Sequence, residues 1–282
     1  RNCFPLSSSK AEKIFQLIHC DIWGPYRASS TNGAHYLLTI VDDASRATWV
    51  YLMVDKGETS YFLKEFIIMV KNQFDTSVKV VRSDNGSEFT SKPMQQFYHD
   101  HGILRQSSCV ETPQQNGRVE RKHRHILNVA RALLFQANLP IKFWGECVLT
   151  AVHLINRTPS KVLQGKTPFE ALYQKKPSYT HLRVFGTLCF AQNKRVRDKF
   201  TPRGRKCVFL GYPFGKKGWK LLDLETQEFF VSRDVIFHEN LFPYALDSTG
   251  EPSFPPPQFS RSLPFDEPQS QISPSSYVRG SI

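Results

Sequence analysis

Five short apolar segments in the first 110 residues have the composition of buried strands. Val, Ile, Leu and aromatic residues dominate them, and Gly, Pro, Asn or Asp residues separate them. The strand candidates are residues 14–21, 35–42, 47–54, 77–83 and 103–108. Short connections join the first three, which predicts an antiparallel meander.

Helical periodicity begins after the third strand candidate and returns in the middle of the chain. Residues 58–74 repeat apolar side chains at helical spacing and predict an amphipathic helix. A long helix is predicted from about Glu120, a second over residues 141–156, and a shorter one near 167–173.

The pattern changes again near residue 182. From there to about residue 242, short apolar runs punctuated by glycine predict a small β-rich module, such as a barrel. From residue 246 the chain is rich in Pro and Ser and is expected to be disordered or a linker. The sequence therefore predicts an α/β fold in which a mixed sheet with flanking helices precedes a β-rich module.

Three acidic residues stand where predicted elements end or begin. Asp21 lies near the carboxyl end of the first strand, Asp84 follows the fourth strand, and Glu120 begins the long helix, with 35 residues between the last two. Mg²⁺ prefers oxygen ligands and is usually held by one or two carboxylates together with water and substrate phosphate. Three converging carboxylates could therefore seat a pair of ions, an arrangement that serves phosphodiester cleavage.

Other acids compete with this trio. Asp42 and Asp43 end the second strand candidate, and Glu88 follows closely after the second acid of the trio, so each is a candidate accessory ligand. An Asp at a strand end is more often a turn residue or a cap. His19 shares a strand face with Asp21 and is a candidate neighbour of that acid.

The phrases around these acids resemble the integrase region of copia-type LTR retrotransposon polyproteins, within the retroviral integrase superfamily. The matching phrases are IHCDIWGP, IVDDASRATWVY, VRSDNGSEF, TPQQNGRVERKHRHI, FWGECVLTAVHLINRTPS, KTPFEALYQKKPSYTHLRVFG and RGRKCVFLGYPFGKKGWKLLDLETQEFFVSRDVIFHE. The resemblance implies an RNase H-like core with a mixed five-stranded sheet and a DD(35)E site of Asp21, Asp84 and Glu120. It also implies two Mg²⁺ or Mn²⁺ ions as cofactors. By analogy with retroviral integrases, the β-rich module would be an SH3-like DNA-binding barrel.

The resemblance divides the chain into four parts. Residues 1–11 are expected to be a linker after a missing zinc-binding module, so no zinc is expected in this fragment. Residues 12–178 would form the catalytic core, and 179–245 the small C-terminal module. Residues 246–282 would be the Pro/Ser-rich disordered tail.

Charge and cysteine usage narrow the class of partner and compartment. The net charge of +12 predicts binding to a polyanion. Residues 246–282 have a net charge of −2, so the preceding chain has a net charge of +14. The six cysteines include no C-x-x-C pair, which favours a reduced intracellular compartment. No apolar stretch approaches the ~20 residues needed to span a bilayer, so no membrane partner is expected.

Two basic clusters are candidates for DNA contact. The first surrounds Glu120 on its predicted helix, and the second lies within the predicted β-rich module. The candidate DNA-binding residues are Arg118, Arg121, Lys122 and Arg124 in the first cluster and Lys194, Arg195, Arg197, Lys199, Arg203, Arg205 and Lys206 in the second. The alternatives are a solvated helix face and a flexible charged loop. Asn85, Gln115 and Asn116 are accessory candidates whose amides could meet bases or phosphates.

Together these features predict a retrotransposon integrase, a metal-dependent polynucleotidyl transferase and endonuclease. Water would trim a DNA end, and a DNA 3′-hydroxyl would join that end to target DNA. We expect element DNA ends and target DNA as partners, a homo-oligomer as the active form, and a nuclear location preceded by a cytoplasmic particle. Two alternatives remain open: an RNase H-like nuclease that cuts without joining, and a non-catalytic DNA-binding relic.

Overall fold

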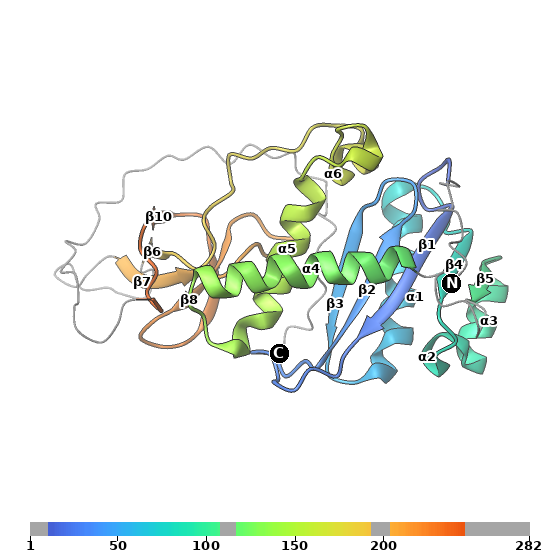
Figure 1. Ribbon diagram of the computed structural model, residues 1–282, viewed down its shortest axis with the longest axis horizontal. Coiled ribbons are helices and arrows are strands. Elements are labelled where there is room, and N and C mark those ends of the chain that lie inside the picture. Colours follow the sequence, from blue (N-terminus) through green and yellow to red (C-terminus); the bar gives the residue numbers. More distant parts are fainter. Residues whose placement is uncertain (1–10, 108–116, 193–203, 246–282) are drawn as a thin grey trace, which may run out of the picture.

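The computed structural model describes residues 11–107, 117–192 and 204–245 (Figure 1). Its first sheet has the strand order β3-β2-β1-β4-β5. The five strands are β1 (Leu17–Trp23), β2 (Tyr36–Asp42), β3 (Thr48–Met53), β4 (Val80–Ser83) and β5 (Leu104–Ser107). β1, β2 and β3 pair antiparallel, whereas β4 lies parallel to both β1 and β5. This confirms the predicted mixed five-stranded sheet that begins with a meander.

The first strand begins three residues later than the sequence pattern predicts. Phe15 has a positive φ of 59°, and its backbone N–H donates to Asp42 Oδ1 at 2.7 Å. A second hydrogen bond, from Gln16 N to Lys13 O at 3.2 Å, closes a turn over these residues. The apolar side chains that suggested a strand here therefore belong to a turn that leads into β1.

Helices cover both faces of the sheet because apolar side chains alternate along its strands. Trp49, Tyr51 and Met53 of β3 share a buried cluster with α1 (Thr59–Phe74) and α3 (Lys92–Asp100). Val50 and Leu52 of the same strand face a second cluster formed with α4 (Gly117–Gln136) and α5 (Trp144–Arg157). The remaining helical elements are η1 (Lys56–Glu58), α2 (Ser87–Thr90), η3 (Ile141–Phe143), η4 (Lys161–Leu163) and α6 (Pro168–Tyr173).

A second sheet of five strands follows the helices, as predicted for a β-rich module. Its strands are β6 (Leu188–Gln192), β7 (Gly204–Phe209), β8 (Trp219–Asp223), β9 (Phe229–Ser232) and β10 (Val235–His238). They pair antiparallel in the order β10-β6-β7-β8-β9. Figure 1 shows this sheet at one end of the molecule and the first sheet at the other, with α4 extending between them.

The two sheets share one hydrophobic cluster through α4. Val208 and Leu222 of the second sheet pack in the same cluster as Ala130 of α4. Gly186, with φ +81°, approaches the end of α4 so closely that a Cβ there would lie 2.2 Å from Ala137 Cβ. Glycine permits both the backbone conformation and the contact. The β-rich module is therefore packed tightly onto the helical layer.

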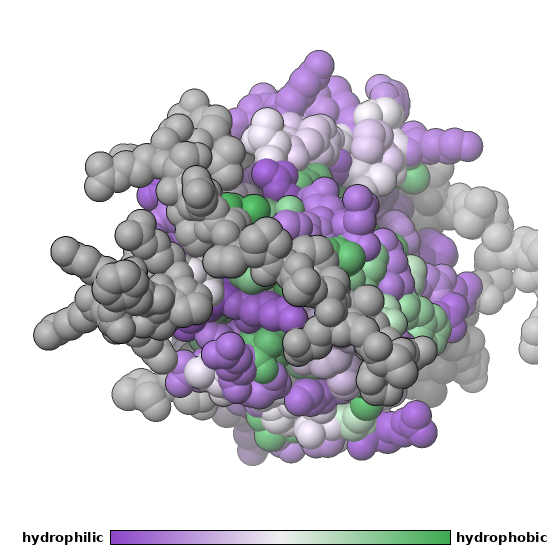
Figure 2. All heavy atoms as spheres, turned by 90° about the vertical axis from the view of Figure 1, so that its left-hand side faces the viewer, coloured by the Kyte–Doolittle hydropathy of each residue, from purple (hydrophilic) through white to green (hydrophobic). Residues whose placement is uncertain are grey.

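The described residues at the end of the molecule that carries the second sheet expose mainly polar side chains. Figure 2 looks onto that end and shows mostly hydrophilic residues, with smaller hydrophobic areas between them.

Within the described ranges, no helix combines the length and the apolar character that a membrane crossing requires. Cys20, Cys147, Cys189 and Cys207 are buried thiols, and none of them forms a disulfide with another residue that the structure describes. The predicted tail and nearly all of the predicted N-terminal linker lie outside the described residues.

Candidate active site

The sheet topology brings the first two acids of the trio to the same sheet edge. β1 and β4 are parallel neighbours, and the last residues paired between them are His19 and Arg82. Asp21 and Asp84 each lie two residues further along, so the two acids stand at the same level of adjacent chains. The carboxyl ends of parallel strands meet at one edge of a sheet, which is where binding sites of α/β folds commonly lie.

Asp21 is a half-buried carboxyl with a strongly altered protonation equilibrium. Burial raises its pKa, the negative charge of Asp84 adds to the rise, and the pKa reaches about 7. A hydrogen bond from Ile22 N to Asp21 Oδ1 at 3.0 Å acts in the opposite direction. The charges of Glu120 and Glu88 contribute smaller rises. Four carboxyl groups therefore share one electrostatic environment.

Local turns fix the positions of Asp84 and Glu88. Asp84 Oδ1 accepts a hydrogen bond from Gly86 N at 3.1 Å, which is typical of an Asx turn. Glu88 lies in the first turn of α2, and its carboxyl atoms lie only 2.7–2.9 Å from the position of a Cβ on Gly86. Glu88 thus folds back toward the turn that follows Asp84. Its role as an accessory ligand stays a prediction.

The third acid and an unexpected histidine come from α4. Glu120 lies in the exposed part of the first turn, and His123 follows one turn later with only 8% of its surface exposed. His123 Nδ1 lies 3.4 Å from Asp21 Oδ2. Burial lowers the pKa of His123 to about 4, so this imidazole is neutral at physiological pH. It therefore contacts Asp21 without neutralising its charge.

His123 is not among the candidate site residues that the sequence predicted. Its position three residues after Glu120 was the available signal, because residues at that spacing are neighbours on a helix surface.

Asp42 and Asp43, the rival acids, are occupied by structural contacts. Asp42 accepts hydrogen bonds from Phe15 N and from the backbone and hydroxyl of Ser45 at 2.6–2.8 Å. Burial raises the pKa of Asp42. Burial acts the same way on Asp43, but a hydrogen bond from His19 and the nearby arginines outweigh it, and the pKa of Asp43 lies below its ordinary value. These contacts favour the turn and cap interpretation for both residues.

The basic residues of α4 fall into two groups. Arg121 and Arg124 are exposed, whereas Arg118 contacts the carboxyl of Asp43. Lys122 is half-buried, and burial together with the charge of Arg46 lowers its pKa to about 8. Exposure thus favours Arg121 and Arg124 for DNA contact, and the DNA-binding role of all four stays a prediction.

Only two members of the second basic cluster lie within the described residues. Arg205 Nη1 lies 3.2 Å from Asp223 Oδ2, and its guanidinium carbon lies 3.9 Å from the centre of the Phe230 ring. Lys206 is half-buried on the same strand. The other candidates fall outside the described ranges, namely Lys194, Arg195, Arg197, Lys199 and Arg203.

The accessory amides are placed only in part. Asn85 is exposed beside Asp84, and its Oδ1 accepts a hydrogen bond from Arg105 Nη2 at 3.4 Å. Gln115 and Asn116 lie outside the described residues.

The acid trio fits a hard divalent cation. Asp21, Asp84 and Glu120 offer only oxygen donors, which Mg²⁺ and Mn²⁺ accept readily. Repulsion from Asp84 and Glu120 helps to raise the pKa of Asp21, and a cation bound among these acids would relieve it. In the part of the chain that the structure describes, no three His, Cys, Asp or Glu side chains lie close enough together to hold a metal ion. The trio therefore matches the cation in donor type and charge.

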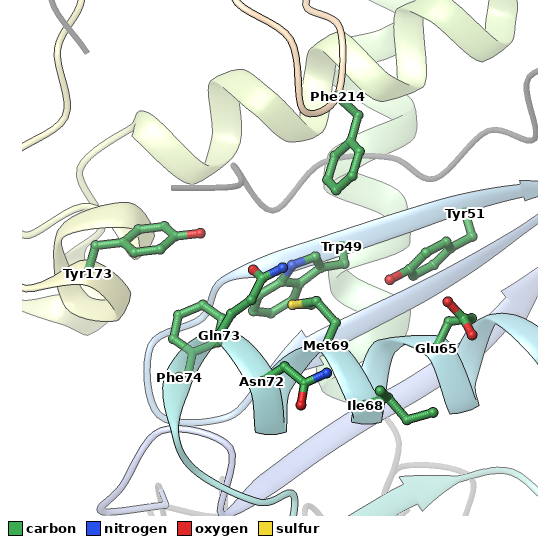
Figure 3. A pocket seen from close by; sticks show the side chains of 10 residues that line it. All are labelled: Trp49, Tyr51, Glu65, Ile68, Met69, Asn72, Gln73, Phe74, Tyr173 and Phe214. Carbon is green, nitrogen blue, oxygen red and sulfur yellow. The ribbon is translucent and has the colours of Figure 1, made fainter. Parts of the chain in front are cut away.

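A pocket of about 230 Å³ lies elsewhere, between α1, β3 and α6. Figure 3 shows the aromatic rings of Trp49, Phe74, Tyr173 and Phe214 around it. None of Asp21, Asp84, Glu88 and Glu120 lines this pocket. The acids occupy an edge of the sheet, which suits a substrate too large to be enclosed.

Two family models match this chain. The Integrase core domain matches residues 11–113, and the Retroviral polymerase SH3-like domain matches residues 187–250.

Two plant polyproteins are similar to this chain over most of its length. The Retrovirus-related Pol polyprotein from transposon TNT 1-94 of Nicotiana tabacum is 38% identical over 248 residues, which cover 88% of this chain and 19% of that protein. The corresponding polyprotein from transposon RE1 of Arabidopsis thaliana is 35% identical over 243 residues, covering 86% of this chain and 16% of the relative. The chain thus spans less than a fifth of the length of these relatives.

Solved structures with a similar fold are more distant in sequence. The catalytic core domain of BIV integrase has a TM-score of 0.43 and 19% identity, covering 57% of this chain and 95% of that one. The HTLV-2 integrase catalytic core domain in complex with magnesium has the same score and identity, covering 56% and 96%.

Proposed function

The chain belongs to the integrase region of copia-type retrovirus-related Pol polyproteins, and from this premise we propose that it cuts element DNA ends and joins them to target DNA. The observation that carries the proposal is the shared electrostatic environment of Asp21, Asp84 and Glu120 at one edge of an integrase-type sheet. Excess negative charge at that place is what a divalent-metal phosphodiester site requires.

In the proposed mechanism Asp21, Asp84 and Glu120 hold two Mg²⁺ or Mn²⁺ ions. Bound ions supply Lewis acidity toward both the attacking and the leaving oxygen at phosphorus. His123, neutral and buried, restrains the Asp21 carboxyl without cancelling its charge. The Asx turn after β4 restrains Asp84 in the same way.

The chain's basic residues would hold the DNA. Arg121 and Arg124 are exposed, follow Glu120 within about one turn of α4, and can bind phosphates near the acids. The net charge of +12 supports a polyanionic partner. We further propose a homo-oligomer that acts in the nucleus, because an element has two ends to join and the target chromosome lies there.

Replacing Asp84 by Asn tests the proposal directly. The substitution keeps the size of the side chain and removes the charge, so end trimming and joining should both be lost. Salt-sensitive DNA binding should remain, because the exposed arginines are unchanged. Labelled duplexes with element-end sequence, incubated with Mg²⁺ and separated on a denaturing gel, report both reactions.

Asp100→Asn is the matched control, because that side chain is exposed on α3 and 54% accessible. It should retain both activities. Equal activity of Asp84→Asn and the parent would end the assignment. If the parent protein cleaved DNA without forming joined products, it would be a nuclease instead. If the parent bound DNA without any Mg²⁺-dependent cleavage, it would be a non-catalytic relic.

A further inference from the structure

Asp43 is the buried acid with the widest set of partners near the candidate site. Asp43 directly follows β2, and its side chain is 1% exposed. Asp43 Oδ2 accepts a hydrogen bond from Ala11 N at 2.7 Å. Asp43 Oδ1 accepts from His19 Nε2 at 3.0 Å and from Arg46 Nη1 at 3.2 Å, and it also contacts Arg118 Nη1. One carboxyl therefore joins four separate segments of the chain.

Two of these partners lie on the elements that carry the acids. His19 precedes Asp21 by two residues on β1, and both side chains point to the same face of the strand. Arg118 precedes Glu120 by two residues in the first turn of α4. Asp43 thus links the strand of the first acid to the helix of the third.

We propose that Asp43 is a positioning residue that holds α4 and β1 in the register that the acid trio needs. The proposal rests on the function proposed above, since it assigns Asp43 a task in that same site. Phosphoryl-transfer chemistry is sensitive to such placement, because a displacement of about 1 Å can lower the rate ~10²-fold.

Asp43 is buried and both of its carboxyl oxygens already accept hydrogen bonds, which assigns it a supporting place beside the acids and not among them. Asp43 N donates to Leu17 O at 2.9 Å, which sets Asp43 level with the start of β1. Asp21 lies four residues further along that strand, or roughly 13 Å at about 3.3 Å per residue. Asp43 therefore acts on the site through His19 on β1 and Arg118 on α4.

The charges around Asp43 make its carboxylate hard to replace. Arg46 and Arg118 are mostly buried, with side-chain exposures of 16% and 18%. Removing the anion would take away the charge that Arg46 and Arg118 share, and the repulsion between these two cations would push the first turn of α4 away from the β2–β3 turn. That movement would carry Glu120 away from Asp21.

The test compares Asp43→Asn with the parent in four measurements. These are single-turnover DNA joining at saturating DNA, DNA affinity, Mn²⁺ binding by calorimetry without DNA, and thermal unfolding. We expect a joining rate lower by about 10- to 100-fold and Mn²⁺ binding weaker by several fold, with DNA affinity within about twofold of the parent. A purely structural role would lower only the unfolding temperature.

Glu146→Gln is the matched control for destabilisation. Glu146 is also a buried acid, and it pairs with Lys220 Nζ at 3.1 Å and Thr31 Oγ1 at 2.7 Å. Its loss should lower the unfolding temperature, while the joining rate and Mn²⁺ affinity of the folded protein stay unchanged.

Arg118→Gln keeps the inference testable if Asp43→Asn fails to fold, because it breaks the link from Asp43 to α4 and leaves the buried carboxyl and its other partners in place. It should lower the joining rate and Mn²⁺ affinity. Weaker DNA binding at unchanged Mn²⁺ affinity would instead assign Arg118 to DNA contact and overturn the inference. If the parent joins DNA and both variants match its joining rate and Mn²⁺ affinity, the inference about Asp43 is overturned and the proposed function stands. If the parent itself does not join DNA, the proposed function is overturned together with the inference.

Discussion

Replacing Asn156 by Leu should destabilise the protein strongly, because this amide completes the edge of the first sheet. β3 is an edge strand, so its outward backbone groups have no neighbouring strand. Thr48 N donates to Asn156 Oδ1 at 3.0 Å, and Asn156 Nδ2 donates to Thr48 O at 2.8 Å. Both residues are fully buried. The amide of α5 thus takes the place of a paired strand.

The size of the effect follows from those two hydrogen bonds. Leu has the same branched arrangement of side-chain heavy atoms as Asn, with larger methyl groups, but it can neither donate nor accept, so one buried N–H and one buried C=O of Thr48 would lose their partner. Each orphaned buried group costs about 1–3 kcal/mol, which gives a loss of roughly 2–6 kcal/mol in the free energy of unfolding. That is a large fraction of the ~5–15 kcal/mol typical of a folded protein.

Urea unfolding followed by circular dichroism measures this loss, with the midpoint and slope fitted together. Asn128→Leu is the control, because Asn128 is exposed on α4 and its replacement should change stability by less than about 0.5 kcal/mol. A loss for Asn156→Leu no larger than that of the control would refute the reasoning, since Thr48 would then have other partners.

Three further predictions concern pH, packing and DNA. The pKa of Asp21 is about 7 in the folded protein against an ordinary 3.8, so the folded state binds the proton more tightly, and the metal-free stability should fall as the pH rises from about 4 to 7. Asp21→Asn should abolish that slope in thermal unfolding. Gly186→Ala should cost more stability than Gly215→Ala: both have positive φ, but only Gly186 would bring a Cβ within 2.2 Å of Ala137, and equal losses would contradict the packing argument. Arg124→Ala should weaken DNA binding and reduce the slope of log affinity against log salt by about 0.9, as measured by fluorescence anisotropy.

The sheets, the helices and the acids at their ends could be predicted from the amino-acid sequence. Residues alternate in a strand and recur every 3.6 residues in a helix, so burial leaves a readable pattern. Trp49 and Val50 are adjacent in sequence and face opposite clusters, as that alternation requires. Asp21 and Asp84 could be predicted as neighbours once both were placed at ends of strands in one sheet.

Tertiary structure alone decided which polar side chains meet. Arg118 and Asp43 are 75 residues apart, and each has the sequence signature of an ordinary surface charge or turn residue. The β1 start was predicted three residues too early because the hydrogen bond from Phe15 to Asp42 comes from a distant segment.

His123 shows the same limit within the candidate site. Its sequence neighbours are mostly cations, and only the packing of α4 against β1 buries it beside Asp21 and keeps it neutral. The physical reason is that periodicity depends on a residue's own chemistry and its near neighbours, whereas a hydrogen bond or a pKa depends on whichever distant group packing places beside it.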